Sequence, residues 1–258
     1  MPLRLHFFAL FIVLSTSIGL AAESANKTGK VRLGIHNFPP GFVMSGDGKT
    51  CSGRAVDILD RILNPVGLQI VPQCGTPARI YRQLDSGDLD IGISTITNPL
   101  VNHSHLFLTP PYTQLVLMLY SHPESATGAA TNSVVAIRGF EYQGQRLKLI
   151  QQGFEFIEMP DAVSAINFFL HQRAQHLISY QEPFLHYLQQ HDAAPQSQIR
   201  QQHLMTVDAQ LVVSARSAYK ERIIQAVAQY AARHQCHYLT ACPPTDAAAP
   251  TPEIQPPL

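Results

Sequence analysis

Short apolar runs alternate with helix-like segments over residues 31–93, and this order restricts the fold more than any other feature. Val31–Ile35, Leu68–Val71 and Leu89–Ile93 are short and mostly apolar, which predicts buried strands. Between them, apolar residues recur at helical spacing from Gly53 to Asn64 and again from Arg79 to Leu84, which predicts two helices. The order strand, helix, strand, helix, strand predicts an α/β layer with a mainly parallel sheet.

The same alternation resumes further along the chain after a break. Leu115–Tyr120 is a strongly apolar strand, and the small residues of Ala126–Ser133 predict a loop. The polar run Gln189–Gln202 is expected to lie on the surface. Further strands are expected at Val134–Ile137, Phe154–Ile157, Leu177–Ser179 and Val207–Ser214, and further helices at Gln145–Gln152, Asp161–Leu170, Pro183–Leu188 and Tyr219–Arg233.

Two α/β lobes follow from this pattern. The last predicted strand and helix have no layer of their own, so the simplest topology returns them to the first lobe. Lobe 1 then comprises residues 30–120 with 207–238, and lobe 2 comprises residues 121–206. Because the chain passes between the lobes twice, a hinge is expected near Leu115–Ser121 and Gln201–Thr206.

The two ends of the chain are excluded from the fold. Arg4, the apolar run Phe7–Leu14 and the small residues before Glu23 predict a cleaved signal peptide at residues 1–22. The apolar run is shorter than the roughly 20 residues that span a bilayer, and no cysteine stands at the cleavage point to accept a lipid. A soluble periplasmic product is therefore expected. The tail at residues 243–258, rich in Pro and Ala, is expected to be disordered.

The charge balance restricts the partners. Eighteen basic and eighteen acidic side chains cancel, and like charges form no block. Nucleic acid and an anionic membrane are therefore not expected as partners, whereas a small solute is. A monomer without a cofactor is the simplest expectation.

The four cysteines are expected to form disulfides, because an exported chain meets an oxidising compartment. Three pairings exist. Cys51 and Cys74 flank one helix-and-strand unit, and a Cys236–Cys242 bond would fix the end of the last helix, so this pairing is favoured. The alternative is a metal site. Its candidate ligands are His234, Cys236, His237 and Cys242, whose spacing matches no zinc pattern, or His103 and His105, which have no third ligand.

Five stretches together resemble the polar amino-acid-type solute-binding proteins, family 3 of the ABC transporter substrate-binding proteins, over roughly Val31 to His234. The stretches read VRLGIHNFPPGF, SGRAVDILDRIL, LDSGDLDIGISTIT, FLTPPYTQLVLMLY and VVAIRGFEY. The resemblance implies the type 2 periplasmic-binding fold, which has two α/β lobes that close on a ligand held between them. It also implies delivery of the ligand to a membrane permease.

The resemblance implies ligand contacts from the first lobe. Phe38 matches an aromatic residue that stacks on the ligand, with a core aromatic as the alternative. Ser94, Thr95 and Thr97 match a polar stretch whose hydroxyl and backbone N–H groups meet an anionic group, with an ordinary helix N-cap as the alternative. Tyr112 matches a hinge-strand tyrosine that either faces the cleft or packs between the lobes.

One departure from the family pattern concerns the ligand's charge. Amino-acid-binding members carry an arginine a few residues after the Thr of this stretch, where it grips the α-carboxylate. Leu100 stands at about that place here, so a free α-amino acid is in doubt. Arg79 or Arg138 would be a substitute cation, and a surface salt bridge is the alternative for each.

The second lobe is expected to contribute the other half of the site. Gly139 suits a turn that presents backbone N–H groups, and its neighbours Arg138, Phe140 and Tyr142 would reach a ligand. Glu182 matches an acidic residue for the ligand ammonium, although the alignment can slip to Gln181. The alternative for Glu182 is the first turn of a helix, where a carboxylate is favoured in any case.

Binding without chemistry is the favoured function, with two alternatives. A sensory binding protein that presents its ligand state to a membrane receptor would have the same fold and cleft. A dehydratase-like enzyme would need a general acid, for which only Glu182 or Glu141 qualifies. Nucleophilic catalysis has little support, because no Gly-x-Ser-x-Gly motif is present.

Overall fold

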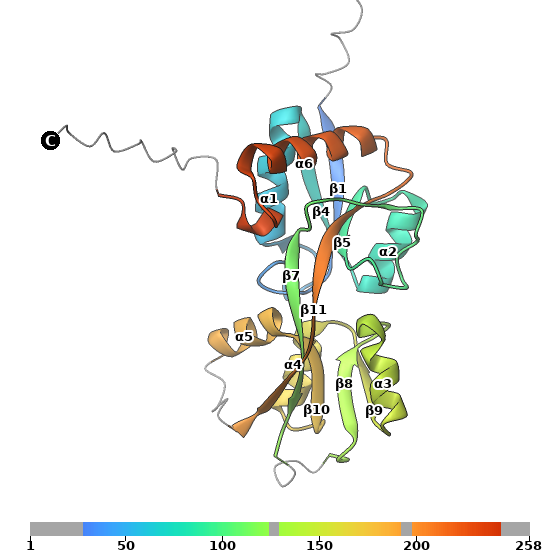
Figure 1. Cartoon of the computed structure of the whole chain (residues 1–258), viewed down its shortest axis with the longest axis vertical. Helices are drawn as coiled ribbons and strands as arrows, with labels where there is room; N and C mark the ends of the chain where they lie inside the picture. Colours follow the sequence, from blue (N-terminus) through green and yellow to red (C-terminus); the bar gives the residue numbers. More distant parts are fainter. Residues whose placement is uncertain (1–27, 124–128, 192–197, 244–258) are drawn as a thin grey trace, which may run out of the picture.

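The computed structural model describes residues 28–123, 129–191 and 198–243. Two lobes lie one above the other in Figure 1, and two long strands, β7 (Thr113–Ser121) and β11 (Arg200–Val213), run from one to the other. Nine strands form one sheet in the order β4-β1-β5-β11-β7-β10-β8-β9, with β6 (Leu106–Phe107) beside β11. The expected α/β class with two lobes is confirmed.

Lobe 1 is built on the parallel strands predicted from the first apolar runs. The three strands are β1 (Gly29–Ile35), β4 (Leu68–Cys74) and β5 (Ile91–Ser94), with β1 in the centre. The helices α1 (Arg54–Leu63), α2 (Pro77–Ser86) and α6 (Lys220–His234) surround them, and a short hairpin joins β2 (Val43–Met44) to β3 (Cys51–Ser52). Helix α1 packs against β4 and α6, whereas α2 packs against β1 and β5. The buried face of α1, which includes Ile58, Leu59 and Ile62, supplies much of the lobe-1 core.

Lobe 2 repeats the arrangement on a smaller scale. The parallel strands are β10 (His176–Tyr180), β8 (Ser133–Ile137) and β9 (Glu155–Met159). The helices are α3 (Gln145–Gln151), α4 (Ala162–Leu170) and α5 (Gln181–Gln190). Every residue of β8 is buried, which explains the uninterrupted apolar run Val134–Ile137.

A two-stranded connector joins the lobes. In β7, Leu117–Ser121 pairs with β10 of lobe 2, and in β11, Gln210–Val213 pairs with β5 of lobe 1. Between these stretches, Thr113–Val116 and Thr206–Ala209 pair only with each other among the described residues. We call these eight residues the connector. The sequence-based lobe bounds and hinge stay predictions, and the connector overlaps the expected hinge at Leu115, Val116 and Thr206.

One element is longer than the sequence predicts. β11 begins at Arg200, whereas Gln189–Gln202 was expected to be surface and the strand to begin at Val207. The exposed side chains of Arg200, Gln201 and Gln202 give this half of the strand no apolar signal. It forms because the partner strand β7 satisfies its backbone groups, so pairing decides the structure here and side-chain pattern does not.

Both disulfides lie in lobe 1. Cys51 of β3 is bonded to Cys74 at the end of β4, and Cys236 is bonded to Cys242. The second bond closes a loop after α6, residues 236–242, which we call the carboxyl loop. Because Cys236 and Cys242 are bonded to each other, they are not available as thiolate ligands for the metal site considered above.

The carboxyl loop is fastened to the start of β7 and to the connector. The backbone N–H groups of Leu239 and Thr240 donate to the carbonyl oxygens of Pro111 and Tyr112, each at 3.0 Å. The hydroxyl of Tyr238 donates to Asp208 Oδ1 at 3.1 Å and accepts from Gln114 Nε2 at 2.9 Å. The loop therefore holds both connector strands.

The predicted signal peptide and the predicted tail beyond residue 243 lie outside the described residues. Within the described ranges, no helix combines the length and the apolar character needed to cross a bilayer.

Candidate functional site

A cavity of about 70 Å³ lies between the lobes, with residues of both lobes in its lining. Lobe 1 contributes the loop after β1 and the turn after β5. Lobe 2 contributes the turn after β8 and the junction of β10 with α5. The connector residues Thr113, Leu115 and Ala209 also line the cavity.

Aromatic rings form most of the cavity walls. Phe38 of lobe 1 and Tyr180 of lobe 2 face each other with ring centroids 5.5 Å apart. Phe42 and Tyr112 stack at 6.4 Å, and Phe140 lies edge-on to His36 at 6.1 Å across the lobes. Five of these six rings are at least nine-tenths buried, the exception being Phe140. The cavity therefore suits a flat molecule.

Local structure fixes the loop that carries Phe38 and Phe42. These two residues pair through both backbone groups, at 3.0 and 2.9 Å. Gly53 at the start of α1 packs against the carbonyl of Gly41, where a Cβ atom would lie 2.5 Å away, and its φ of 124° also requires glycine. The Cys51–Cys74 bond fastens the adjoining hairpin to β4. The lobe-1 aromatic wall is thus anchored from both sides.

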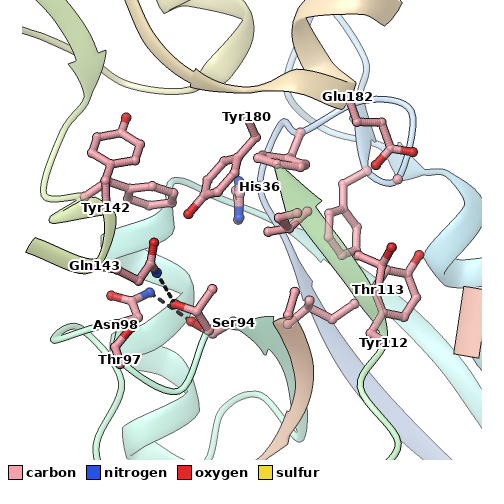
Figure 2. A pocket seen from close by; sticks show the side chains of 18 of the residues that line it. His36, Ser94, Thr97, Asn98, Tyr112, Thr113, Tyr142, Gln143, Tyr180 and Glu182 are labelled. Atoms are coloured by element: carbon pink, nitrogen blue, oxygen red, sulfur yellow. Dashed lines mark hydrogen bonds between the residues drawn. The ribbon is translucent and has the colours of Figure 1, made fainter. Parts of the chain in front are cut away.

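A polar turn after β5 forms part of the cavity wall on the lobe-1 side. Asn98 Nδ2 donates to Ser94 Oγ at 2.9 Å, and Leu100 N donates to Asn98 Oδ1 at 3.0 Å. The turn is not followed by a helix, so the N-cap alternative for Ser94, Thr95 and Thr97 is wrong. Figure 2 shows Ser94 and Asn98 on the side of the cavity that faces Gln143.

A strained turn presents the lobe-2 groups. Tyr142 and Gln143 have φ values of 48° and 53°, in the left-handed region that side chains other than glycine rarely adopt. The hydroxyl of Tyr142 accepts a hydrogen bond from Ile137 N at 2.8 Å. Arg146 donates to the carbonyls of Phe140 and Ile137 and to Glu158 Oε1, at 2.7, 3.2 and 2.6 Å. These bonds hold the turn in place.

Polar contacts join the lobes around the cavity. Gln143 Nε2 donates to Thr95 Oγ1 at 2.8 Å, which is one of the dashed lines in Figure 2. Arg54 of α1 lies 4.0 Å from Glu182 of α5, with both side chains about half exposed. The structure therefore represents a closed arrangement.

His36 is the buried histidine of the site. Burial lowers its pKa to about 4, and a backbone contact with Asn37 offsets only part of this effect. The ring is therefore neutral at pH 7. Burial likewise raises the pKa of the Tyr112, Tyr142 and Tyr180 hydroxyls, which stay protonated.

Most of the residues expected at the site line the cavity. They are Phe38, Ser94, Thr95, Thr97, Tyr112, Phe140, Tyr142 and Glu182. Glu182 also occupies the first turn of α5, as its alternative interpretation predicts. Their contact with a ligand stays a prediction.

Three expected residues do not line the cavity. Arg79 is exposed on α2, whose buried face consists of Pro77, Ile80, Tyr81 and Leu84. Arg138 is exposed as well. Neither places a cation in the cavity lining, and their role as substitute cation stays a prediction. Gly139 lies beside the cavity, and a Cβ atom there would be 3.5 Å from Leu100 Cδ1, so the leucine at the place of the family's arginine packs across the lobe interface.

Sequence reasoning missed several lining residues. His36 and Tyr81 gave no signal, since a lone histidine after a strand and an aromatic residue on a helix are usual core features. Gln143 and Tyr180 had a positional signal, because each adjoins a residue that was considered. Within the described residues, no group of three or more His, Cys, Asp and Glu side chains is placed to hold a metal ion.

Two lobes, a double crossover and a cleft between them define the type 2 periplasmic-binding fold. No family model matches the chain, and no curated protein matches it. Among solved structures, an ancestral arginine-binding protein bound to arginine superposes with a TM-score of 0.65 at 16% identity, covering 81% of this chain and 94% of that one.

Two other similar structures come from different functional settings. A histidine kinase sensor domain with similarity to periplasmic binding proteins has a TM-score of 0.64 at 14% identity, covering 82% of this chain and 93% of that one. The ancestral amino-acid-binding protein AncCDT-1, a precursor of cyclohexadienyl dehydratase, has a TM-score of 0.61 at 12% identity, covering 80% and 89%. At these identities the comparisons show the fold alone.

Proposed function

We propose that this protein binds a small solute between its two lobes and performs no chemistry on it. One observation carries the proposal, namely a cavity lined from both lobes and from the connector between them. Contacts such as Gln143 with Thr95 exist only when the lobes are together. A ligand that touches both faces binds the closed state more tightly and so shifts the population toward it.

Export to the periplasm and delivery to an ABC-type permease complete the proposal. The predicted signal peptide and the two disulfides support an oxidising compartment. The resemblance to family 3 supports uptake. The protein would act as a monomer that presents its closed form to the permease.

Sensing is the second candidate, because a kinase sensor domain superposes on the chain as well as a binding protein does. Ligand closure would be the same in both roles, and only the membrane partner differs. Crosslinking in the native membrane followed by identification of the partner separates a permease from a receptor.

A dehydratase activity has less support from the site. Glu141 and Glu182 are the carboxylates that line the cavity among the described residues, and both side chains are nearly half exposed. Incubation with prephenate-like acids tests this alternative, and turnover would overturn the non-enzymatic assignment.

The test of binding is a thermal-shift screen of small metabolites on the full chain, followed by small-angle scattering with each hit. A ligand at 100 times its dissociation constant adds about 2.7 kcal/mol to the free energy of unfolding. We expect the radius of gyration to fall with a hit. A solute that stabilises the protein without this fall, or the lack of any stabilising solute, would contradict the proposal.

A further inference from the structure

The cavity has no charged group in its buried lining. Among the described residues, the charged side chains that line it are Arg54, Glu141 and Glu182, with exposed fractions of 48%, 46% and 44%. Arg54 and Glu182 lie 4.0 Å apart, and Glu141 lies 3.9 Å from Arg146. These charges are at the rim and already face opposite charges.

An ionised ligand would therefore be costly to bind. A carboxylate or ammonium group in the interior of the cavity loses its water and finds no opposite charge there. His36, a buried titratable group of the lining, is neutral at pH 7 because burial lowers its pKa to about 4. The cavity thus disfavours a charged amino acid such as the arginine bound in one of the similar structures.

The lining instead offers neutral hydrogen-bonding atoms that are not used. His36 Nδ1, Tyr112 OH and Gln143 Oε1 are buried and have no hydrogen-bond partner among the described residues. His36 and Tyr112 are 8% and 4% exposed. A buried polar atom without a partner destabilises the protein, so three of them in one lining point to a ligand that supplies the partners.

The walls and the volume define the ligand's shape. Phe38, Phe42 and Tyr180 present rings to the cavity, which favours a flat molecule. The 70 Å³ of space corresponds to about five to seven water molecules, since each needs about 10–15 Å³ by this measure. Such a space accommodates one six-membered ring with small substituents.

We infer that the cleft selects an uncharged, planar solute of about one ring, with hydrogen-bond donors and acceptors on its edge. The inference rests on the proposed binding function and specifies its ligand class. Gln143 Oε1 requires a donor from the ligand, whereas Tyr112 OH and the neutral His36 ring can each pair with a donor or an acceptor. A heteroaromatic amide or a nucleobase has these properties.

Calorimetric titration of the full chain at pH 7 tests the inference with pairs that differ in charge. The pairs are nicotinamide with nicotinate and uracil with orotate, and L-arginine and L-glutamine are the amino-acid probes. We expect the neutral member of at least one pair to bind, at least tenfold more tightly than its anion and than either amino acid. An anion or an amino acid that binds as tightly as the neutral rings overturns the inference.

A matched pair of variants tests the unused hydroxyl. Tyr112→Phe removes the cavity hydroxyl, and we expect the bound neutral probe to lose about three- to tenfold in affinity. The unfolding midpoint of the unliganded protein should not fall, because the hydroxyl has no partner there to lose. Tyr120→Phe is the control, because the Tyr120 hydroxyl is also buried without a partner but lies outside the cavity. Equal affinities for Tyr112→Phe and wild type overturn the role of the hydroxyl.

The outcomes separate this inference from the proposed function. Binding of arginine, glutamine or an anion as tightly as the neutral rings refutes the neutral ligand class and leaves solute binding intact. Binding of none of the probes also refutes the inference, and the thermal-shift screen then decides whether solute binding itself stands.

Discussion

The lobe-1 face of the cleft is fastened by a covalent bond, whereas the lobe-2 face depends on one buried arginine. Cys51–Cys74 anchors the hairpin beside Phe42, and Gly53 fixes the start of α1. Across the cleft, Arg146 holds a turn with two left-handed residues through two carbonyls and Glu158. The comparison indicates that lobe 1 is a preformed platform and that lobe 2 carries the strain of the site.

The largest expected effect tests the covalent side of this comparison. Replacing both Cys51 and Cys74 by Ser should lower the free energy of unfolding by about 3.5 kcal/mol, from the chain entropy of a loop with a sequence separation of 23. Urea titration at pH 7 measures the change. The Lys30→Ala substitution, on an exposed side chain of β1, serves as a surface control. An unchanged urea midpoint would show that lobe 1 does not depend on the bond.

A pH titration tests the lobe-1 face through His36. The folded pKa of about 4 lies below the ordinary value of 6.5, so the unfolded chain binds the proton first as the pH falls. Stability is therefore lost between about pH 6.5 and pH 4, by about 2.5 kcal/mol at pH 4.5. His36→Phe should lose less over the same range. Equal losses in urea titrations of the two proteins would contradict the buried neutral ring.

The lobe-2 face is tested by Arg146→Ala. This change leaves Glu158 and two carbonyls without their donor, and we expect a loss of about 2 kcal/mol in the free energy of unfolding. Because the turn positions Gln143, solute affinity should fall as well. Lys148→Ala on the exposed side of α3 is the control. If Arg146→Ala retains full affinity, the turn keeps its binding conformation without the hydrogen bonds of Arg146.

The smallest expected effect compares the aromatic walls directly. Phe38→Ala should weaken binding of the most stabilising solute from the screen by about 1.5 kcal/mol if the ring stacks on the ligand. Isothermal calorimetry gives the change in affinity. Phe154→Ala removes a ring outside the cavity and should leave affinity unchanged. Unchanged affinity in Phe38→Ala would assign this ring to the core.

The fold was predictable where side-chain pattern and pairing agree. The runs that became β5 and β8 are mostly apolar because every residue in them is buried. β1 and β4 instead alternate buried apolar residues with exposed or half-buried ones, and the periodicity of α1 reflects its single buried face. The first half of β11 was not predictable, since Arg200, Gln201 and Gln202 are exposed and only their backbone is paired.

The sequence predicted where the site lies better than which polar groups it presents to a ligand. Phe38 and Glu182 line the cavity as expected, because both follow strand ends that a two-lobed fold brings together. Arg79 does not, because the expectation used proximity in sequence and ignored which face of α2 is buried. The unused atoms of His36 and Tyr112 are invisible to sequence, since satisfaction of a polar group depends on distant neighbours.

The carboxyl loop is expected to determine where the connector bends. Its hydrogen bonds hold Gln114 and Asp208 at the lobe-1 end of the connector, and the Cys236–Cys242 bond keeps the loop short. Leu115, Val116, Thr206 and Val207 form the half of the connector nearer lobe 2, which these hydrogen bonds do not reach. Opening is then expected to be a rotation of lobe 2 while lobe 1 and the lobe-1 end of the connector stay fixed. A label attached just after Cys242 would stay nearly still during this motion, while one on α3 or α4 would travel the farthest.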